Sequence, residues 1–265
     1  MLASVCIATH NKREILQRVL QSIIYQIDVR KDVQVIVVDD GSMDGTADMV
    51  VKSFPSVICA QTRSEGSGYR NPSVARNMAA KLARGKILVL QSDDVIHYPG
   101  SLNLMLDLPP GRFNISKVLN QYADGNMGDV YTGETNPRPL FFLGSVLRKD
   151  FYAIGGNDEE FTEPGYEDNW LAHCLGNGAG VSPLYRDDSL GFHQDHGRPD
   201  IGGSYQRMSA LFQSKAEKAV AGEIPWCASG GPWQYVEGKS WYEACTDESG
   251  AGESLGGDER SVLDR

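Results

Sequence analysis

The sequence predicts an α/β protein with a mostly parallel, Rossmann-like central sheet flanked by helices. Over residues 1–98, short apolar runs rich in β-branched residues alternate with segments of helical periodicity. Each run is too short for a helix and suits a strand that is buried on both faces. Two of the runs end in paired aspartates, at 39–40 and 93–94. Because ligands in open α/β sheets bind outside the carboxyl ends of the strands, these acid pairs predict one shared ligand site.

The first half of the chain has clear signals for each element. Strands are expected at residues 4–8, 33–38, 57–60 and 87–90. Helices are expected where apolar residues recur at helical period, over 15–24, from 46 to the residue before Pro55, and from 72 to 84. We expect Gly85 to end the third helix as its C-cap. This alternation is typical of a right-handed parallel sheet.

Signals are weaker in the second half. Helices are expected at about 101–108, 149–155, 167–175 and 204–221, and strands at 140–147 and 181–185, whereas 111–139 predict no element. The aromatic stretch 226–242 either packs on the core or forms a platform for a sugar. We therefore expect one main domain over 1–200, with halves at 1–98 and 99–200, and an extension over 201–245. Residues 246–265 are polar and glycine-rich, which predicts a disordered tail.

Composition excludes several classes of protein. With 265 residues and 41% hydrophobic content, the chain can bury one large core. A formal net charge of -10 argues against a nucleic-acid partner. The five cysteines are scattered without a CxxC pair, which argues against a disulfide framework or a zinc ribbon. No apolar run reaches the ~18 residues of a membrane span. We expect a soluble cytoplasmic protein, either free or peripheral to a membrane.

Several segments together resemble a known family. They are SVCIATHNKREIL, VQVIVVDDGSMDGT, ARNMAAKLARGKILVLQSDD, and GGNDEEF followed by GYEDNWL. In order and spacing, they resemble the family 2 inverting glycosyltransferases of GT-A fold, including domains of chondroitin-polymerase and galactosyltransferase type. The resemblance covers residues 4–196. It implies metal-dependent transfer of a sugar from a nucleotide-diphosphate donor, with UDP favoured, to a hydroxyl of a glycan or other acceptor, as in polysaccharide biosynthesis.

The resemblance implies a donor site with a divalent metal. The residues that it places against the nucleotide are Thr9, Asn11, Asp39, Asp40 and Arg76. The DxD motif that holds the metal on the diphosphate falls on residues 91–93, where Asp93 keeps the position of the metal ligand. Gln91 replaces the first acid of the motif, so we interpret Gln91 and Ser92 as sugar or ribose contacts.

The resemblance also implies an acceptor side. The catalytic base of the family's acceptor loop maps to Asp168, which Glu167 precedes. A late pair of metal ligands three residues apart maps to His193 and His196. With one acid of the DxD motif replaced, these imidazoles become more necessary, and His196 is the preferred ligand. A carboxylate, imidazole nitrogens, diphosphate oxygens and water would suit Mn²⁺ and tolerate Mg²⁺.

Other interpretations stay open at this point. The acids at 167–168 could be ordinary residues of a helix N-terminus, and the two histidines could be structural. The replacement at Gln91 also allows a catalytically silent module that binds nucleotide sugars or carbohydrates. Another nucleotide enzyme, such as a nucleotidyltransferase or an NAD oxidoreductase, is the third class. The first strand is not followed by GxGxxG, which argues against a dinucleotide site.

Overall fold

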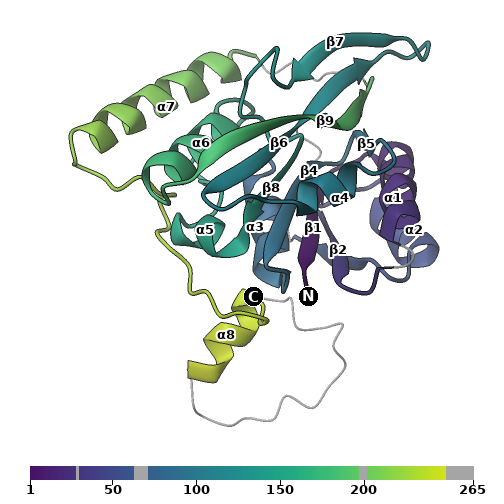
Figure 1. The fold of residues 1–265 in the computed structure, drawn as a ribbon, viewed down its shortest axis with the longest axis horizontal. Helices are drawn as coiled ribbons and strands as arrows, with labels where there is room; N and C mark the ends of the chain where they lie inside the picture. The colour runs from purple at the N-terminus through teal and green to yellow at the C-terminus, as the bar shows by residue number, and fades with distance from the viewer. Residues whose placement is uncertain (28–29, 63–70, 197–201, 249–265) are drawn as a thin grey trace.

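Four parallel strands form one half of the central sheet in the computed structural model, which describes residues 1–27, 30–62, 71–196 and 202–248 (Figure 1). In spatial order they are β3 (Ile58–Gln61), β2 (Val33–Asp39), β1 (Ala3–Thr9) and β4 (Ile87–Ser92). The helices between them are α1 (Arg13–Ile27), α2 (Thr46–Ser53) and α3 (Ser73–Leu82). Strands β1, β2 and β4 are largely buried, in agreement with their apolar sequences. The predicted α/β alternation is thus confirmed.

The other half of the sheet mixes parallel and antiparallel pairs. From β4 outward the order is β8 (Leu143–Leu147), β6 (Arg112–Gln121), β9 (Ser182–Gln194) and β5 (Val95–His97), and β7 (Met127–Thr132) pairs with β6. Only β6 and β9 run parallel among these pairings; the others are antiparallel. The sequence predicted β8 and the start of β9, whereas β5, β6 and β7 were not predicted.

Helices cover both faces of the sheet. The remaining ones are α4 (Ser101–Leu106), α5 (Arg148–Ala153), α6 (Glu167–Asn177), α7 (Ser204–Val220) and α8 (Trp241–Glu248). One apolar core lies between the sheet and α1, α2 and α4, and a second lies between the opposite face and α3, α5, α6 and α7 (Figure 1). No helix in the described part of the chain is long and apolar enough to cross a membrane.

Gly85 does not end α3, contrary to expectation. The helix stops at Leu82, and the N–H of Ala83 donates to the carbonyl oxygen of Ala80. Gly85 instead lies where the chain passes β1. A Cβ at this position would stand 2.4 Å from the carbonyl carbon of Ala3. Glycine is therefore needed here for close backbone approach.

The C-terminal extension packs on the main domain. The fully buried guanidinium of Arg148 donates to the carbonyl oxygens of Gly85 (2.8 Å), Lys239 (2.6 Å) and Val236 (3.1 Å). Trp233 meets the ring of Tyr152 edge to face, with centroids 5.3 Å apart. These contacts show that this part of the aromatic stretch contributes to packing.

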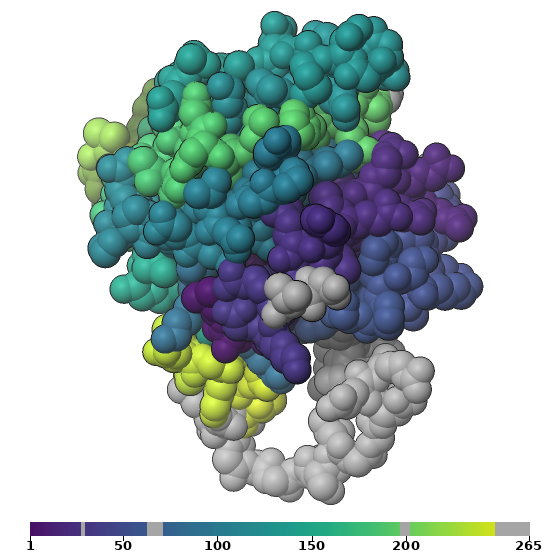
Figure 2. All heavy atoms as spheres, turned by 45° about the vertical axis from the view of Figure 1, so that its right-hand side comes forward, coloured from purple at the N-terminus to yellow at the C-terminus, as the bar shows by residue number. Residues whose placement is uncertain are grey.

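Helix α8 closes the described part of the extension. Figure 2 shows it in yellow against the body of the protein, where Arg84 Nε lies 2.9 Å from a carboxylate oxygen of Glu243. The predicted tail boundary at residue 246 is wrong, since residues 246–248 belong to α8. The rest of that tail, residues 249–265, lies outside the described residues.

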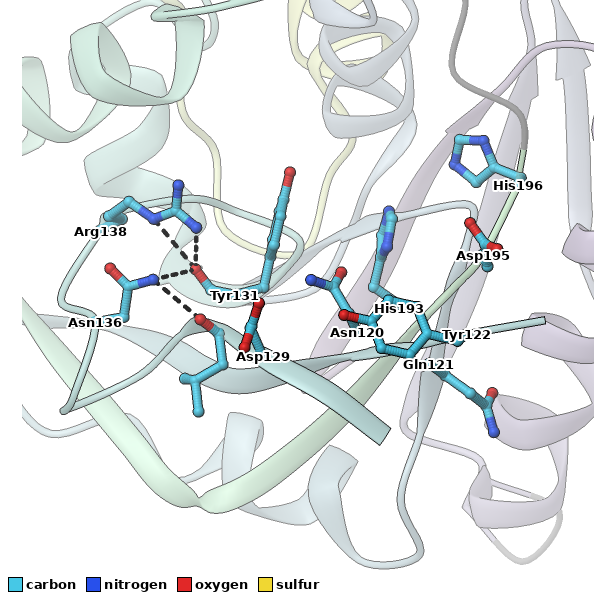
Figure 3. A pocket seen from close by; sticks show the side chains of 11 residues that line it. Asn120, Gln121, Tyr122, Asp129, Tyr131, Asn136, Arg138, His193, Asp195 and His196 are labelled. Atoms are coloured by element: carbon cyan, nitrogen blue, oxygen red, sulfur yellow. Dashed lines mark hydrogen bonds between the residues drawn. The ribbon is translucent and has the colours of Figure 1, made fainter. Parts of the chain in front are cut away.

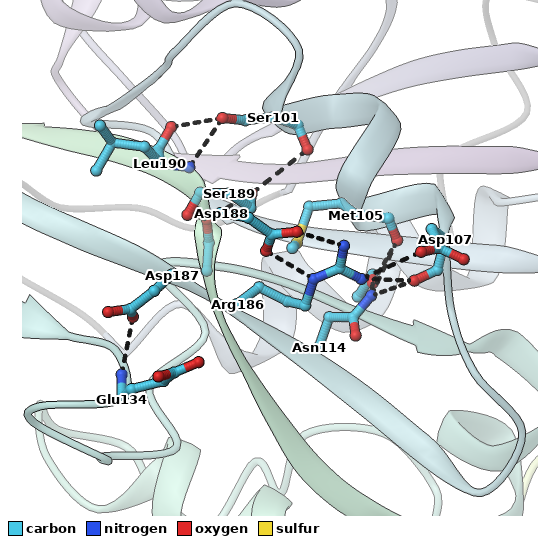
Figure 4. A network of polar contacts seen from close by, with 12 residues as sticks. Ser101, Met105, Asp107, Asn114, Glu134, Arg186, Asp187, Asp188, Ser189 and Leu190 are labelled. Atoms are coloured by element: carbon cyan, nitrogen blue, oxygen red, sulfur yellow. Dashed lines mark hydrogen bonds and ion pairs between the residues drawn. The ribbon is translucent and has the colours of Figure 1, made fainter.

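A bulge in β9 sets the register of the strand's second half. Ser116 pairs with Arg186, but the next residue, Lys117, pairs with Leu190, so the three residues between bulge out. Arg186 holds Asp188 (Nε to Oδ1, 2.8 Å; Figure 4). Ser116 donates to the carbonyl oxygen of Ser189 (2.7 Å). The bulge re-aims the strand, so that residues 191–194 pair with β6 on one side and 191–193 with β5 on the other.

Candidate active site

A cavity of about 450 Å³ opens at the carboxyl ends of β1 and β4. The N-terminus of α6 and the end of β9 complete its wall. Predicted site residues that line it are Thr9, Asp40, Arg76, Ser92, Asp93, Glu167, Asp168, His193 and His196. The cavity thus unites strand ends from the first half of the chain with a helix and a strand from the second half.

One carboxylate and two imidazoles form a cluster in this cavity. Nε2 of His196 lies 3.0 Å from Asp94 Oδ2, and Nε2 of His193 lies 3.7 Å from the same oxygen. One ligand atom from each residue lies within 4.8 Å of the others. The other oxygen, Asp94 Oδ1, is buried and has no hydrogen-bond partner among the described residues. This donor set and the unpaired oxygen fit a divalent cation such as Mn²⁺.

The acid in this cluster is Asp94, whereas the sequence favoured Asp93. Asp94 directly precedes β5, and β5 pairs with β9 so that Val95 lies opposite His193. The N–H of Gln194 also donates to the carbonyl oxygen of Asp94 (2.9 Å). Pairing of β5 and β9 therefore aims Asp94 at the histidines. This pairing could not be predicted, because β5 has only three residues.

Asp93 and Asp94 share a cation from the loop after β1. Lys12 Nζ lies 2.9 Å from Asp93 Oδ1 and 2.6 Å from Asp94 Oδ2. Burial would raise the pKa of Asp94, but the hydrogen bond with His196 and the charge of Lys12 hold it well below its ordinary value. Burial and the charge of Asp94 together raise the pKa of Asp93, despite Lys12. Sequence reasoning did not single out Lys12.

Aromatic rings fix the orientation of His193. Tyr131, from β7, stacks on the imidazole with ring centroids 5.4 Å apart and an interplanar angle of 7°. Phe142 meets the same ring edge to face at 5.6 Å. The N–H groups of the Asn136 side chain donate to the carbonyl oxygens of Val130 (3.0 Å) and Tyr131 (3.1 Å). These contacts hold the hairpin that presents Tyr131.

A second cavity, of about 510 Å³, adjoins the first (Figure 3). The two share Tyr131, His193 and His196. Its remaining lining is largely polar and includes Asn120, Asp129, Asn136, Arg138 and Asp195. A ligand in the second cavity would therefore lie next to the cluster of Asp94 and the two histidines.

Asp168 is held by two donors at the start of α6. Arg76 Nη1 lies 3.0 Å from Asp168 Oδ1, and the N–H of Phe141 donates to Oδ2 at 3.0 Å. The preceding residue, Glu167, accepts the N–H of Gly165 at 2.9 Å. Burial and the neighbouring charge of Asp168 raise the pKa of Glu167 to about 7. Two carboxyl groups in different environments thus meet in one cavity wall.

Gln91 does not reach the cavity, which corrects its interpretation as a sugar or ribose contact. Its side chain is fully buried; Nε2 donates to the carbonyl oxygen of Val95 (2.8 Å) and Oε1 lies 2.7 Å from His97 Nε2. Burial lowers the pKa of His97 to about 4. A neutral amide beside this neutral imidazole avoids the cost of a buried charge. Gln91 is a structural residue of β4 that contacts both ends of β5.

Asp39 and Asn11 also lie outside the lining of the cavity. The buried carboxylate of Asp39 accepts the N–H of Ser42 (3.1 Å) and the side-chain N–H of Gln61 (3.1 Å). Asn11 has a φ of 51° and accepts the N–H of Met43 at 2.8 Å. Both residues therefore shape the loops around Asp40 rather than line the cavity themselves.

Comparison with known proteins identifies the family. Residues 4–143, more than half of the chain, match the model of the family described as glycosyl transferase family 2. The fold is that of an open α/β protein whose cavity lies outside the carboxyl ends of its strands. The chain belongs to glycosyl transferase family 2.

Curated relatives of the chain are named as glycosyltransferases. One is poly(ribitol-phosphate) beta-N-acetylglucosaminyltransferase TarP of Staphylococcus aureus, 29% identical over 57% of this chain and 46% of the relative. Another is validoxylamine A glucosyltransferase of Streptomyces hygroscopicus subsp. jinggangensis, 26% identical over 74% of this chain and 56% of the relative. The chain thus spans about half the length of these relatives.

Solved structures show the same fold. A crystal structure of Staphylococcus aureus TarS matches with a TM-score of 0.61 and 18% identity, over 81% of this chain and 65% of that one. The mannosyltransferase PcManGT of Pyrobaculum calidifontis, in complex with GDP-Man and Mn²⁺, matches with a TM-score of 0.58 and 19% identity, over 82% and 64% of the two chains. The predicted GT-A fold is thereby confirmed.

Proposed function

We propose that this chain is a metal-dependent, inverting glycosyltransferase that moves a sugar from a nucleotide-diphosphate donor to an acceptor hydroxyl. One observation carries the proposal: the cluster of Asp94, His193 and His196 lines the same cavity as the carboxylate of Asp168. Sugar transfer needs a cation near the departing diphosphate and a base near the attacking hydroxyl. Membership of family 2 supports this combination.

The donor is proposed to be a UDP-sugar that lies between the ends of β1 and β4. Thr9, Asp40 and Arg76 line this part of the cavity. A structure of TarS in complex with UDP-GlcNAc supports the choice of nucleotide. In our proposal Arg76 contacts the donor and also keeps its ion pair with Asp168.

Asp94, His193 and His196 would hold Mn²⁺ or Mg²⁺, with Asp93 beside them. A divalent cation in this position supplies charge that stabilises the departing diphosphate. The chain's own contribution is to aim the ligands: β5 and β9 hold Asp94 and His193 in register, and Tyr131 fixes the plane of the His193 imidazole. Such supporting contacts tune metal affinity as strongly as some ligands do.

Asp168 is proposed to act as the base. Its carboxylate would take the proton of the acceptor hydroxyl while the hydroxyl oxygen attacks the anomeric carbon and the bond to the diphosphate breaks. A single displacement of this kind inverts the anomeric configuration. Arg76 and the N–H of Phe141 hold the carboxylate in place for the reaction.

The acceptor is proposed to be a glycan or another compound with several hydroxyl groups. The adjoining cavity supports this class, because the carboxylate, amide and hydroxyl groups of Asp129, Asn120 and Tyr131 are suitable partners for sugar hydroxyls. The name of the relative TarP, a poly(ribitol-phosphate) beta-N-acetylglucosaminyltransferase, also indicates an acceptor with hydroxyl groups.

A screen for donor hydrolysis tests the proposal without knowledge of the acceptor. The chain is incubated with UDP-, GDP- and dTDP-sugars in the presence of Mn²⁺ or EDTA, and released nucleoside diphosphate is measured. We expect release from a UDP-sugar that EDTA abolishes, and NMR of the early product should show the inverted anomer. Nucleotide binding without turnover would indicate a binding module, and absence of both binding and turnover would refute the proposal.

A further inference from the structure

Lys12 links the metal cluster to the donor cavity. Its loop follows β1, and its ammonium crosses to the turn after β4, where it contacts Asp93 Oδ1 (2.9 Å), Asp94 Oδ2 (2.6 Å) and His196 Nε2 (3.4 Å). Its side chain is only 20% exposed. The ammonium donates hydrogen bonds to the two carboxylates, and His196 Nε2, which also lies 3.0 Å from Asp94 Oδ2, is its third neighbour. Lys12 is therefore held in one place by the groups that form the cation site.

The Lys12 ammonium lies on the oxygen that a metal in the cluster would use, Asp94 Oδ2. Asp94 Oδ2 is the acceptor nearest to Lys12 and also the atom that both histidines approach, at 3.0 and 3.7 Å. A divalent cation bound through Asp94 Oδ2 together with His196 Nε2 would stand against the Lys12 ammonium. Two cations at that separation repel each other strongly in a partly buried site. A metal that binds through Asp94 Oδ2 therefore requires Lys12 to move away.

The donor cavity offers Lys12 a new partner. Lys12 lines this cavity together with Asp40 and Arg76. Its flexible four-carbon stem allows the ammonium to reach a different acceptor while the backbone stays in place. A diphosphate in the cavity would bring negative oxygens, and lysine is a common phosphate ligand.

We propose that Lys12 is a tethered cation that occupies the acidic cluster before the donor binds and moves onto the diphosphate when metal and nucleotide arrive. The inference rests on the proposed function, since it assumes a nucleoside diphosphate in the cavity. Lys12 lowers affinity for metal alone and raises affinity for metal and nucleotide together. It thereby makes their binding cooperative, which favours the complete complex over either ligand alone.

Calorimetry on the full chain tests this role without measuring turnover. Mn²⁺ is titrated alone, and UDP is titrated with Mn²⁺ at saturation, into the wild type, Lys12→Met and Lys12→Arg. Methionine keeps the length of the side chain and removes its charge. Lys52→Met is the matched control, because Lys52 is 76% exposed and pairs with Asp48 on α2.

We expect Lys12→Met to bind Mn²⁺ alone about tenfold more tightly and UDP with Mn²⁺ about tenfold more weakly. Lys12→Arg should keep part of the coupling, and Lys52→Met should behave as the wild type. If Lys12→Met binds Mn²⁺ alone no more tightly, or leaves the affinity for UDP unchanged, the proposal is wrong. A wild type that binds neither UDP nor Mn²⁺ would instead refute the proposed function itself.

A measurement on the wild type covers the case in which Lys12→Met does not fold. The ¹³Cε signals of labelled lysines are recorded by NMR before and after addition of Mg²⁺ and UDP, with Lys12→Arg used to assign the Lys12 signal. A shift of this signal that requires both ligands supports transfer of the ammonium to the diphosphate. A signal that does not change when both ligands are bound contradicts it.

Discussion

Arg76 and Asp168 form an ion pair in the wall of the cavity at the ends of β1 and β4, with Nη1 and Oδ1 3.0 Å apart and side chains only 8% and 9% exposed. The two residues come from the first turns of α3 and α6, which lie far apart in the sequence. The pair therefore joins the two halves of the main domain. It also fixes the carboxylate to which we assign the role of base.

Asp168→Asn should remove sugar transfer while it leaves donor binding nearly intact. The amide has almost the same shape as the carboxylate but cannot accept the proton of the acceptor hydroxyl. We expect kcat to fall by about 10² to 10⁴. The measurement is sugar transfer to an identified acceptor, with UDP affinity by calorimetry alongside.

The neighbouring acid provides the control for this prediction. Glu167→Gln changes a carboxyl group in the same turn of α6 and should keep more of the activity than Asp168→Asn. The reverse order of activities would transfer the role of base to Glu167. Near-normal transfer by both variants would exclude both residues as the base.

Arg76→Met should destabilise the fold, because it leaves the carboxylate of Asp168 buried without its cationic partner. Breaking one side of a buried ion pair typically costs about 3 to 5 kcal/mol in the free energy of unfolding. Arg84→Met is a suitable comparison, since its ion pair with Glu243 is exposed (55% and 40%) and should contribute less than about 1 kcal/mol. Urea denaturation gives both values, and equal losses for the two variants would show that burial of the Arg76 pair has little effect.

Metal affinity should depend more on Asp94 than on Asp93. Both carboxylates contact Lys12, but only Asp94 belongs to the cluster of possible ligands that the described residues form with the two imidazoles. We expect Asp94→Asn and His196→Ala each to weaken Mn²⁺ binding by at least about tenfold in calorimetry with UDP present. Asp93→Asn should have a smaller effect. A larger loss for Asp93→Asn than for Asp94→Asn would restore Asp93 as the principal ligand.

The elements that could be predicted from the sequence are those with a clear local pattern of apolar residues. Strands that are buried on both faces, such as β1 and β4, have continuous apolar sequences, and they were predicted within about two residues of their observed ends. β6 and β7 were missed because they carry many polar residues, and even the buried stretch of β6 includes Asn114 and Ser116. The length of β9 was missed because polar residues of the bulge interrupt its apolar pattern.

In the candidate site, too, residues within a local sequence motif were predicted and residues placed by distant contacts were not. Asp40, Arg76 and Asp168 stand in motifs that could be identified locally, and the structure brings them to one cavity. Lys12 and Tyr131 carry no such signal, because their contacts with Asp94 and His193 arise only when distant strands pair. Gln91 was misinterpreted for a related reason: its partner His97 approaches only through the turn between β4 and β5.

The stability of the protein should depend on the ionisation of Glu167. Burial and the charge of Asp168 raise its pKa from 4.5 to about 7. Between these pH values the folded chain keeps the proton of Glu167, whereas the unfolded chain has released it. The folded state then binds more protons than the unfolded state, so the free energy of unfolding falls as pH rises through this window. The contribution of protonated Glu167 to stability is complete below its pKa in the unfolded chain. It is lost as pH rises past its pKa in the folded chain.

Comparison of the wild type with Glu167→Gln isolates this effect, because glutamine cannot ionise. Glu167 is partly exposed, so we expect the difference in unfolding free energy between the two to change by on the order of 1 to 3 kcal/mol from about pH 5 to about pH 8. Urea denaturation at several pH values provides the measurement, with the exposed Glu14→Gln as the control for loss of a surface carboxyl group. The wild type should lose stability relative to Glu167→Gln as pH rises. Parallel profiles across this range would show that Glu167 does not hold a proton near neutral pH, and its raised pKa would then be refuted.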